Sequence, residues 1–155
     1  MERTLIILKP DCVQRGLCGE VLSRFEKRGF SIVGLKMIKL DQKTLKEHYA
    51  HIADKPFFPG IQKFMSSTPV IVAVIEGKEA VETVRAMCGP TNSRKAPSGT
   101  IRGDYGLSMQ CNIIHASDSV ETARKEIERF FAPNEIYAYR RLLEDFTYSP
   151  EEKEG

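Results

Sequence analysis

The chain contains 155 residues, of which 41% are hydrophobic and 28% are charged, and this composition fits one globular domain with its own core. The formal net charge of +2 is too small to indicate a nucleic-acid or membrane partner, so any basic site must be local. The longest apolar run, VIVAVI at 70–75, is far too short to span a membrane, and the N-terminal run is too short for a signal peptide. We therefore expect a cytoplasmic protein with one domain over 1–148 and a polar C-terminal tail over 149–155.

The four cysteines do not form the pattern of a zinc site. Cys12, Cys18, Cys88 and Cys111 contain no C-x-x-C pair, and no histidine lies at ligand spacing from any of them. A chain without a secretory signal is also not expected to carry a disulfide framework. We therefore predict reduced thiols.

The first half of the chain alternates predicted strands and helices. The run TLIIL at 4–8 predicts a buried strand that ends at the turn KPD. Apolar residues at helical spacing over 15–28 predict a helix, with Gly29 as its C-terminal cap. The stretch FSIVGLKMIKL at 30–40 predicts a second strand, and the segment 41–50 predicts a helix with its first aspartate as N-cap.

The second half predicts two strands and two helices around a long loop. After the break at KPFFPG, a short helix is expected over 60–66 and a clearly buried strand over 69–77. A helix follows over 79–88. The segment 89–110 has no regular period and contains four glycines and two prolines, and a loop of this length in a small domain is usually functional or disordered. The run CNII at 111–114 predicts the last strand.

The segment SVETARKEIERFF at 119–131 carries an apolar stripe that predicts a final helix. With the small helices between the second and third strands set aside, the order is βαββαβ plus this helix. That order predicts a ferredoxin-like α+β fold, an antiparallel sheet with helices on one face, with a long loop and a C-terminal extension.

His115 lies where the last strand ends and the final helix begins, in the octet NIIHASDS. Asp118 is expected to cap that helix and to form a capping box with Glu121. A helix N-terminus favours anions and disfavours an imidazolium, so it suits a neutral, nucleophilic histidine next to a phosphate. Glu126 is a candidate acceptor that would fix the ring tautomer: its Cα is roughly 12 Å along the helix from Asp118, and the lean of helical side chains toward the N-terminus shortens that gap without establishing the contact. The same context suits a half-buried structural histidine, and local sequence leaves both interpretations open.

Polar residues elsewhere supply groups that can hold phosphates. They are Lys9, Arg85, Thr91 and Arg102. The chain contains neither the G-x-x-x-x-G-K-[ST] motif nor the G-x-G-x-x-G motif. Side chains, and not a glycine-rich loop, must therefore hold any phosphate.

Taken together, the chain closely resembles the nucleoside diphosphate kinase family, from its N-terminus to about residue 140. The matching segments are KPD-VQRG (9–16), HY (48–49), KPFFPG (55–60), TIRGD (100–104) and NIIHASDS (112–119), the last being the family's active-site signature. Several segments in the right order are far more specific than one octet.

The resemblance implies transfer of the γ-phosphoryl group of a nucleoside triphosphate to a nucleoside diphosphate by a ping-pong route, with Mg²⁺ held mainly through nucleotide phosphates and not by protein ligands. It implies that His115 is the nucleophile and becomes a phosphohistidine, that Ser117 and Glu126 support it, and that Phe57 stacks on the base. The positions that match contacts to phosphate and sugar are Lys9, Tyr49, Arg85, Thr91, Arg102 and Asn112.

The resemblance also implies a homo-oligomer with nucleotides as its ligands. A hexamer is favoured over a tetramer because the C-terminal residues 133–148 resemble those of longer-tailed relatives. Neither a membrane nor a specific nucleic acid is expected as a partner. The chain departs from common family residues at Cys12, Ser93, Met109 and Ala116, and none of these changes removes a catalytic group.

The sequence also allows two other functions. A catalytically silent nucleotide-binding or scaffold protein of the same fold is the main alternative. A ferredoxin-like RNA-binding module would stack bases on aromatic residues of its central strands, but TLIIL and VIVAVI contain none.

Overall fold

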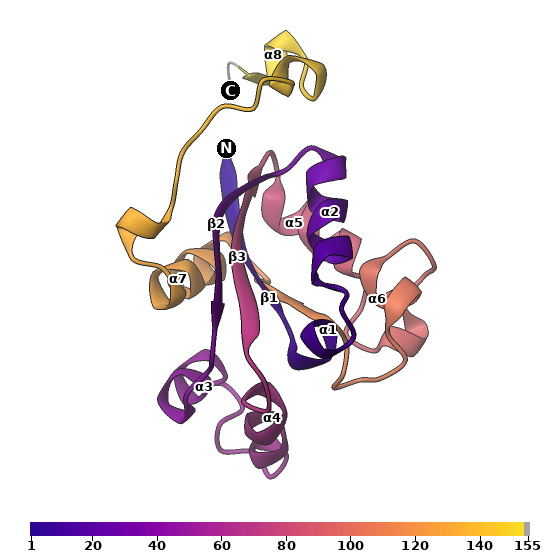
Figure 1. The fold of residues 1–155 in the computed structure, drawn as a ribbon, viewed down its shortest axis with the longest axis vertical. Helices are drawn as coiled ribbons and strands as arrows, with labels where there is room; N and C mark the ends of the chain where they lie inside the picture. The colour runs from indigo at the N-terminus through magenta and orange to yellow at the C-terminus, as the bar shows by residue number, and fades with distance from the viewer. Residues whose placement is uncertain (154–155) are drawn as a thin grey trace.

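The computed structural model describes residues 1–153 and consists of a four-stranded sheet with helices around it (Figure 1). Neighbouring strands run antiparallel in the order β2-β3-β1-β4, which confirms the ferredoxin-like α+β fold. The strands are β1 (Glu2–Leu8), β2 (Ser31–Ile38), β3 (Val70–Gly77) and β4 (Ile114–Ala116).

The helices connect and cover these strands, and most are short. Within the described part of the chain, no helix combines the length and the apolar character that crossing a bilayer requires. The helices are α1 (Pro10–Gln14), α2 (Cys18–Arg28), α3 (Gln42–His48), α4 (Phe58–Met65), α5 (Ala80–Cys88), α6 (Ile101–Tyr105), α7 (Val120–Phe130) and α8 (Pro150–Lys153).

Both faces of the central strands are buried, so the expectation of helices on one face only is wrong. Along β1, side chains alternate between the two faces. Ile6 belongs to the core cluster that contains Phe25 of α2, whereas Leu5 and Ile7 belong to the cluster that contains Phe130 of α7. A continuous apolar run requires this double cover, because neither of its faces can be left in water.

The helix predicted over 15–28 begins later, at Cys18, and a separate short helix that was not predicted precedes it. α1 ends at Gln14 and α2 begins at Cys18, and the chain turns between them at Gly16, whose φ of +66° suits glycine. The predicted C-terminal cap of α2 is confirmed, since Gly29 has a φ of +108°.

The segment 89–110 is folded and packed, and is not an irregular loop throughout. It contains a 3₁₀ turn and α6, which begins where the Thr100 hydroxyl accepts a hydrogen bond from the Gly103 N–H at 3.0 Å. A Cβ atom at Gly103 would lie 1.9 Å from the carbonyl oxygen of Pro97, so only glycine fits there. These contacts join parts of the segment to each other. The spacing of apolar residues in the sequence does not predict them.

The last strand begins later than the predicted run at 111–114, because the chain bends at Ile113. This residue has a φ of +75°, which is rare for a β-branched side chain and prevents strand pairing. Two hydrogen bonds made by the backbone of Ile113 hold the bend. Its N–H donates to the side-chain oxygen Asp11 Oδ2 at 3.0 Å, and its carbonyl accepts from the Lys9 N–H at 2.9 Å. Strain of this kind, about 1–3 kcal/mol, persists only where neighbouring contacts enforce it.

The cap of α7 is Ser119, and the predicted capping box of Asp118 with Glu121 is wrong. The Ser119 side chain accepts a hydrogen bond from the Thr122 N–H at 3.1 Å. Asp118 is exposed and comes one residue before the cap, so its carboxylate does not cap the helix.

Two further boundaries differ from the expectation. α4 begins two residues earlier than predicted, because Pro59 suits the first turn of a helix. Of the polar tail expected over 149–155, residues Pro150–Lys153 form a helical turn, and residues 154 and 155 lie outside the described part of the chain.

Replacing Ser119 with Ala should lower the free energy of unfolding by about 1 kcal/mol, because the first turn of α7 loses its capping acceptor. Urea denaturation at one fixed protein concentration measures this change. The matched control is Asp118→Ala, which should cost less than about 0.5 kcal/mol because it removes no cap. Equal losses in the two variants would contradict the assignment of Ser119.

Candidate active site

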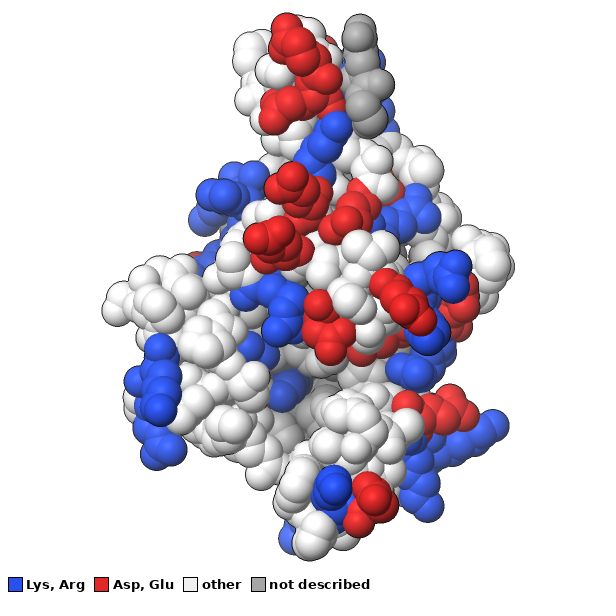
Figure 2. Space-filling view, turned by 180° about the vertical axis from the view of Figure 1, so that it is seen from behind, with Lys and Arg blue, Asp and Glu red and all other residues white. Residues whose placement is uncertain are grey.

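A cavity of about 770 Å³ brings together residues that are far apart in the sequence. In the space-filling view, basic side chains lie in and around a hollow of the face seen from behind (Figure 2). Ser117 is buried and does not line the cavity, and the exposed Phe57 is also outside the lining. The predicted site residues that line it are Lys9, Tyr49, Arg85, Thr91, Arg102, Asn112, His115 and Glu126.

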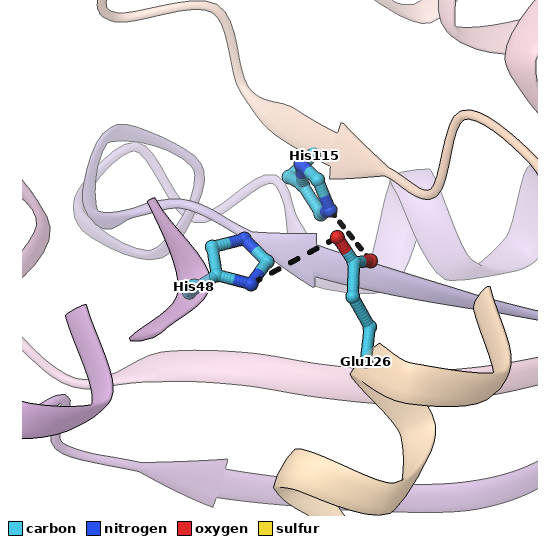
Figure 3. A group of neighbouring side chains, drawn as sticks. All are labelled: His48, His115 and Glu126. Atoms are coloured by element: carbon cyan, nitrogen blue, oxygen red, sulfur yellow. Dashed lines mark hydrogen bonds and ion pairs between the residues drawn. The ribbon is translucent and has the colours of Figure 1, made fainter. Parts of the chain in front are cut away.

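His115 is the central residue of β4 and pairs with Ile7 of β1. Its strand neighbours Ile114 and Ala116 face the core, so strand alternation directs the imidazole to the other side, toward the cavity. Nε2 of His115 lies 2.9 Å from Oε2 of Glu126 (Figure 3). A carboxylate can only accept, so Nε2 carries the proton, and Nδ1 is the unprotonated nitrogen of the neutral ring.

Glu126 is a buried carboxylate on α7, only 5% exposed. Its Oε2 also accepts a hydrogen bond from the Ser117 hydroxyl at 2.6 Å. Burial alone would raise the pKa of Glu126, but the hydrogen bond and charge of His115, together with the Ser117 hydroxyl, hold that pKa below its ordinary value. Glu126 therefore stays ionised and fixes the tautomer of His115.

Lys9 and Arg102 are half-buried and supply positive charge to the lining of the cavity. The Lys9 ammonium donates to Oδ1 of Asn112 at 2.6 Å. Burial lowers the pKa of Lys9 to about 8, and the charge of Arg102 acts in the same direction. The Arg102 guanidinium donates to the carbonyl oxygens of Gly89 and Ile114, both at 2.6 Å, so it ties the long loop to β4.

Asn112 holds the two ends of the long loop together. Its side-chain nitrogen donates to the carbonyl oxygens of Thr91 and Met109, both at 3.0 Å, and its Oδ1 accepts from Lys9. The side chain is buried, and both its donor and its acceptor atoms are used. Asn112 therefore sets where Thr91 and Lys9 lie at the cavity.

Of three other predicted residues, Arg85 and Tyr49 line the cavity and Phe57 does not. Arg85 on α5 makes one long hydrogen bond, 3.4 Å, to the carbonyl of Ala116. Tyr49 follows α3, and burial raises the pKa of its hydroxyl to about 12, so the hydroxyl stays protonated. Phe57 precedes α4 and is 57% exposed, so its ring is a surface feature and not part of the core.

His48 is a site residue for which the sequence alone indicated no role, although HY belongs to a matching segment. It is the last residue of α3 and is buried. Its ring centroid lies 4.6 Å from that of His115, and its Nδ1 lies 3.2 Å from a guanidinium nitrogen of Arg129. The local pattern gave no signal, because a histidine at a helix end is usually exposed and only the tertiary packing buries this one.

His48, His115 and Glu126 each offer one ligand atom, and these atoms lie within 4.8 Å of one another, which is close enough to hold a metal ion. Each group, however, already has a protein partner: Glu126 accepts from His115, and His48 accepts from Arg129. A cation at this point would lie next to the Arg129 guanidinium. The geometry therefore favours a hydrogen-bonded cluster.

The comparisons with known proteins agree with one another. The family model for nucleoside diphosphate kinase matches residues 2–136. A nucleoside diphosphate kinase of Gloeobacter violaceus is 51% identical over 148 residues, which cover 96% of this chain and 99% of that protein. Nucleoside diphosphate kinase B of Mus musculus is 48% identical over 148 residues, with 96% and 97% covered. A halophilic nucleoside diphosphate kinase from Halobacterium salinarum, solved in complex with CDP, superposes with a TM-score of 0.93 at 41% identity, over 96% of this chain and 99% of that one.

The fold and these matches define a nucleotide phosphotransferase. The chain belongs to the nucleoside diphosphate kinase family, which confirms the family, the enzyme class and the phosphoryl transfer between nucleotides that the sequence predicted.

The ammonium of Lys9 should titrate with a midpoint near pH 8 in the ligand-free protein, because burial and Arg102 disfavour its charged form. NMR titration of the lysine side-chain carbons measures the midpoint, and the Lys9→Met variant identifies the signal. Because the folded pKa is below the ordinary value of 10.5, the charged lysine destabilises the fold below pH 8, and this cost is relieved as the pH rises from about 8 to 10.5. A midpoint near 10.5 would rule out the buried placement.

Proposed function

We propose that the protein transfers the γ-phosphoryl group of a nucleoside triphosphate to a nucleoside diphosphate by a ping-pong route in which His115 carries the group, and that this reaction maintains nucleoside triphosphate pools. The observation that carries the proposal is the 2.9 Å hydrogen bond between His115 Nε2 and Glu126. It leaves Nδ1 unprotonated on a half-buried ring at the cavity, which is what a nitrogen nucleophile requires.

In the first half-reaction, the Nδ1 lone pair attacks the γ-phosphorus. The N–P bond forms while the bond from that phosphorus to the bridging oxygen breaks, and the nucleoside diphosphate leaves. The proton on Nε2 stays in place, and the Glu126 carboxylate balances the positive charge that develops on the ring. In the second half-reaction, an oxygen of the acceptor diphosphate attacks the phosphorus, and His115 leaves as a neutral imidazole. Ser117 holds Glu126 in place throughout.

The phosphate groups require positioning and charge neutralisation more than covalent chemistry. The half-buried cations Lys9 and Arg102 suit this task because the electrostatic effect of a charge is larger where it is partly shielded from bulk water. Arg102 uses three of its five N–H donors on the carbonyl oxygens of Gly89, Asn112 and Ile114, which leaves two donors for a phosphate oxygen. The residues proposed to contact phosphate and sugar are Lys9, Tyr49, Arg85, Thr91, Arg102 and Asn112.

The proposal includes Mg²⁺, bound mainly through the nucleotide phosphates. The carboxylates that line the cavity are Asp118 and Glu126, and Glu126 is already bonded to His115 and Ser117. One exposed carboxylate does not form a protein cage, but it suits Mg²⁺, which usually keeps several waters and binds substrate phosphates. The metal would neutralise part of the phosphate charge.

Phe57 is proposed as the surface on which the base stacks. An exposed aromatic ring offers stacking without hydrogen-bond readout, so it accepts purines and pyrimidines alike. The Halobacterium salinarum relative was solved with CDP, which supports nucleotide binding by this chain. The alternative of a silent scaffold is not favoured, because every group that the reaction needs is present.

Exposed apolar side chains support self-association of the chain. Leu35 and Met37 are exposed on the edge strand β2, and Leu142 and Phe146 are 95% and 89% exposed in the turn and 3₁₀ helix that precede α8. An extended stretch of the C-terminal segment leads up to this part of the chain (Figure 1). Apolar surface of this kind usually marks a protein interface. We propose a homo-oligomer, with a hexamer favoured over a tetramer. We also propose the cytoplasm as its compartment, which the four free thiols support.

Replacing His115 with Asn should abolish phosphoryl transfer from ATP to a diphosphate, together with the acid-labile phosphate on the protein.

Glu126→Gln should slow phosphorylation of His115 by about 10- to 150-fold, because a charge-assisted hydrogen bond of about 1.5–3 kcal/mol is weakened. Rapid-quench measurements with radiolabelled ATP follow both. Activity retained in the His115 variant would exclude the phosphohistidine route.

Light scattering should give a mass six times that of the 17.5 kDa protomer. The double variant Leu142→Ser, Phe146→Ser should lower that mass at micromolar concentration, because it removes apolar side chains from the proposed contact. A mass four times that of the protomer would select the tetramer, and a monomer at all concentrations would exclude self-association.

A further inference from the structure

His48 is a buried residue of the cavity that the proposed reaction does not use. Its ring is enclosed by the rings of His115, Tyr49 and Phe130, with centroid distances of 4.6, 4.8 and 5.5 Å. All three contacts are edge-on, with interplanar angles from 67° to 83°. The His48 ring is therefore a fixed wall beside the imidazole that is proposed to carry the phosphoryl group.

Arg129 determines the tautomer of His48. A guanidinium can only donate, so the 3.2 Å contact makes Nδ1 of His48 an acceptor and leaves the proton on Nε2. Burial, followed by the charge of His115, lowers the pKa of His48 to about 3; Arg129 and His51 act in the same direction, and Glu126 opposes them. His48 is therefore neutral at any pH near neutrality.

The neutral state of His48 leaves the Glu126 carboxylate available to His115. Oε1 of Glu126 lies 3.9 Å from Nδ1 of His48, which is too far for a hydrogen bond, whereas Oε2 binds His115 (Figure 3). The same Oε2 also accepts from Ser117. A proton on Nδ1 would draw the carboxylate toward His48. Because Nδ1 accepts from Arg129 instead, no such competition arises.

We propose that His48 is a positioning residue that holds the His115 ring in the orientation presenting Nδ1 to the cavity; this inference rests on the proposed phosphohistidine mechanism. The hydrogen bond from Nε2 alone lets the ring swing about that bond, and a swing takes Nδ1 off the line of attack on phosphorus. The perpendicular His48 ring opposes the swing, because any rotation drives the edge of one ring into the face of the other. Misplacement by about 1 Å can slow such a step by about 100-fold.

Three substitutions separate the ring from the hydrogen-bond acceptor. His48→Ala removes both, His48→Gln keeps an acceptor without a ring, and His48→Phe keeps a planar ring without the acceptor. The matched control is Glu47→Ala, an exposed neighbour on the same helix. The measurements are the single-turnover rate of His115 phosphorylation by ATP, the Kd for ADP, and the ¹⁵N NMR signals of the His115 ring.

The Ala and Gln variants should phosphorylate His115 about 10- to 100-fold more slowly than the unaltered enzyme, because the ring is no longer held. The Phe variant should recover most of that rate, and Glu47→Ala should match the unaltered enzyme. The Kd for ADP should change little, since the proposed phosphate contacts are elsewhere. Because Glu126 still accepts from Nε2, the His115 signals should report the tautomer with the proton on Nε2 in every variant, so a slower rate at an unchanged tautomer identifies a change in ring orientation and not in protonation.

Equal rates in the Phe and Gln variants would overturn the inference, even if the Ala variant does not fold. So would a loss of ADP affinity that equals the loss of rate, because that pattern indicates general disruption of the site. If the unaltered enzyme itself forms no phosphate on His115, the proposed function fails instead, and the two failures are thereby distinguished.

Discussion

Burial of the Glu126 carboxylate is the interaction on which the rest of the site depends. An ion removed from water loses several kcal/mol of solvation unless hydrogen bonds replace it. Here the replacement comes from His115 and Ser117, one in β4 and one directly after it. The β4 strand and α7 must therefore keep one relative position, and the pairing of His115 with Ile7 provides the strand side of that constraint.

Hydrogen bonds to the protein also replace lost solvation at the basic residues that line the cavity. Lys9 is half-buried with a lowered pKa and donates to Asn112 Oδ1, and Arg102 donates to the carbonyl oxygens of Asn112 and Ile114. These hydrogen bonds organise the long loop before any ligand is present. A cavity organised in this way needs little rearrangement when a polyphosphate enters, and preorganised charge is the main means by which phosphoryl transfer is accelerated.

Much of the fold follows from sequence, because short buried strands require continuous apolar runs. TLIIL and VIVAVI specify the two central strands, and Gly29 specifies the end of α2. The start of β4 could not be predicted in the same way, because Ile113 adopts a left-handed conformation that only its bonds to Asp11 and Lys9 explain. The sequence also could not show that Ser119, and not Asp118, caps α7. That choice depends on the direction in which the chain leaves β4.

The sequence by itself determined the family, the central strands and nearly all of the proposed site residues, because these reside in contiguous motifs and apolar periods. Only the tertiary structure decided that Glu126 reaches His115, that Arg102 ties the loop to β4, and that His48 packs edge-on against the His115 ring. The physical reason is that such contacts join side chains from separate elements. Their distances depend on how β4, α3 and α7 pack together, and no local pattern of residues records that packing.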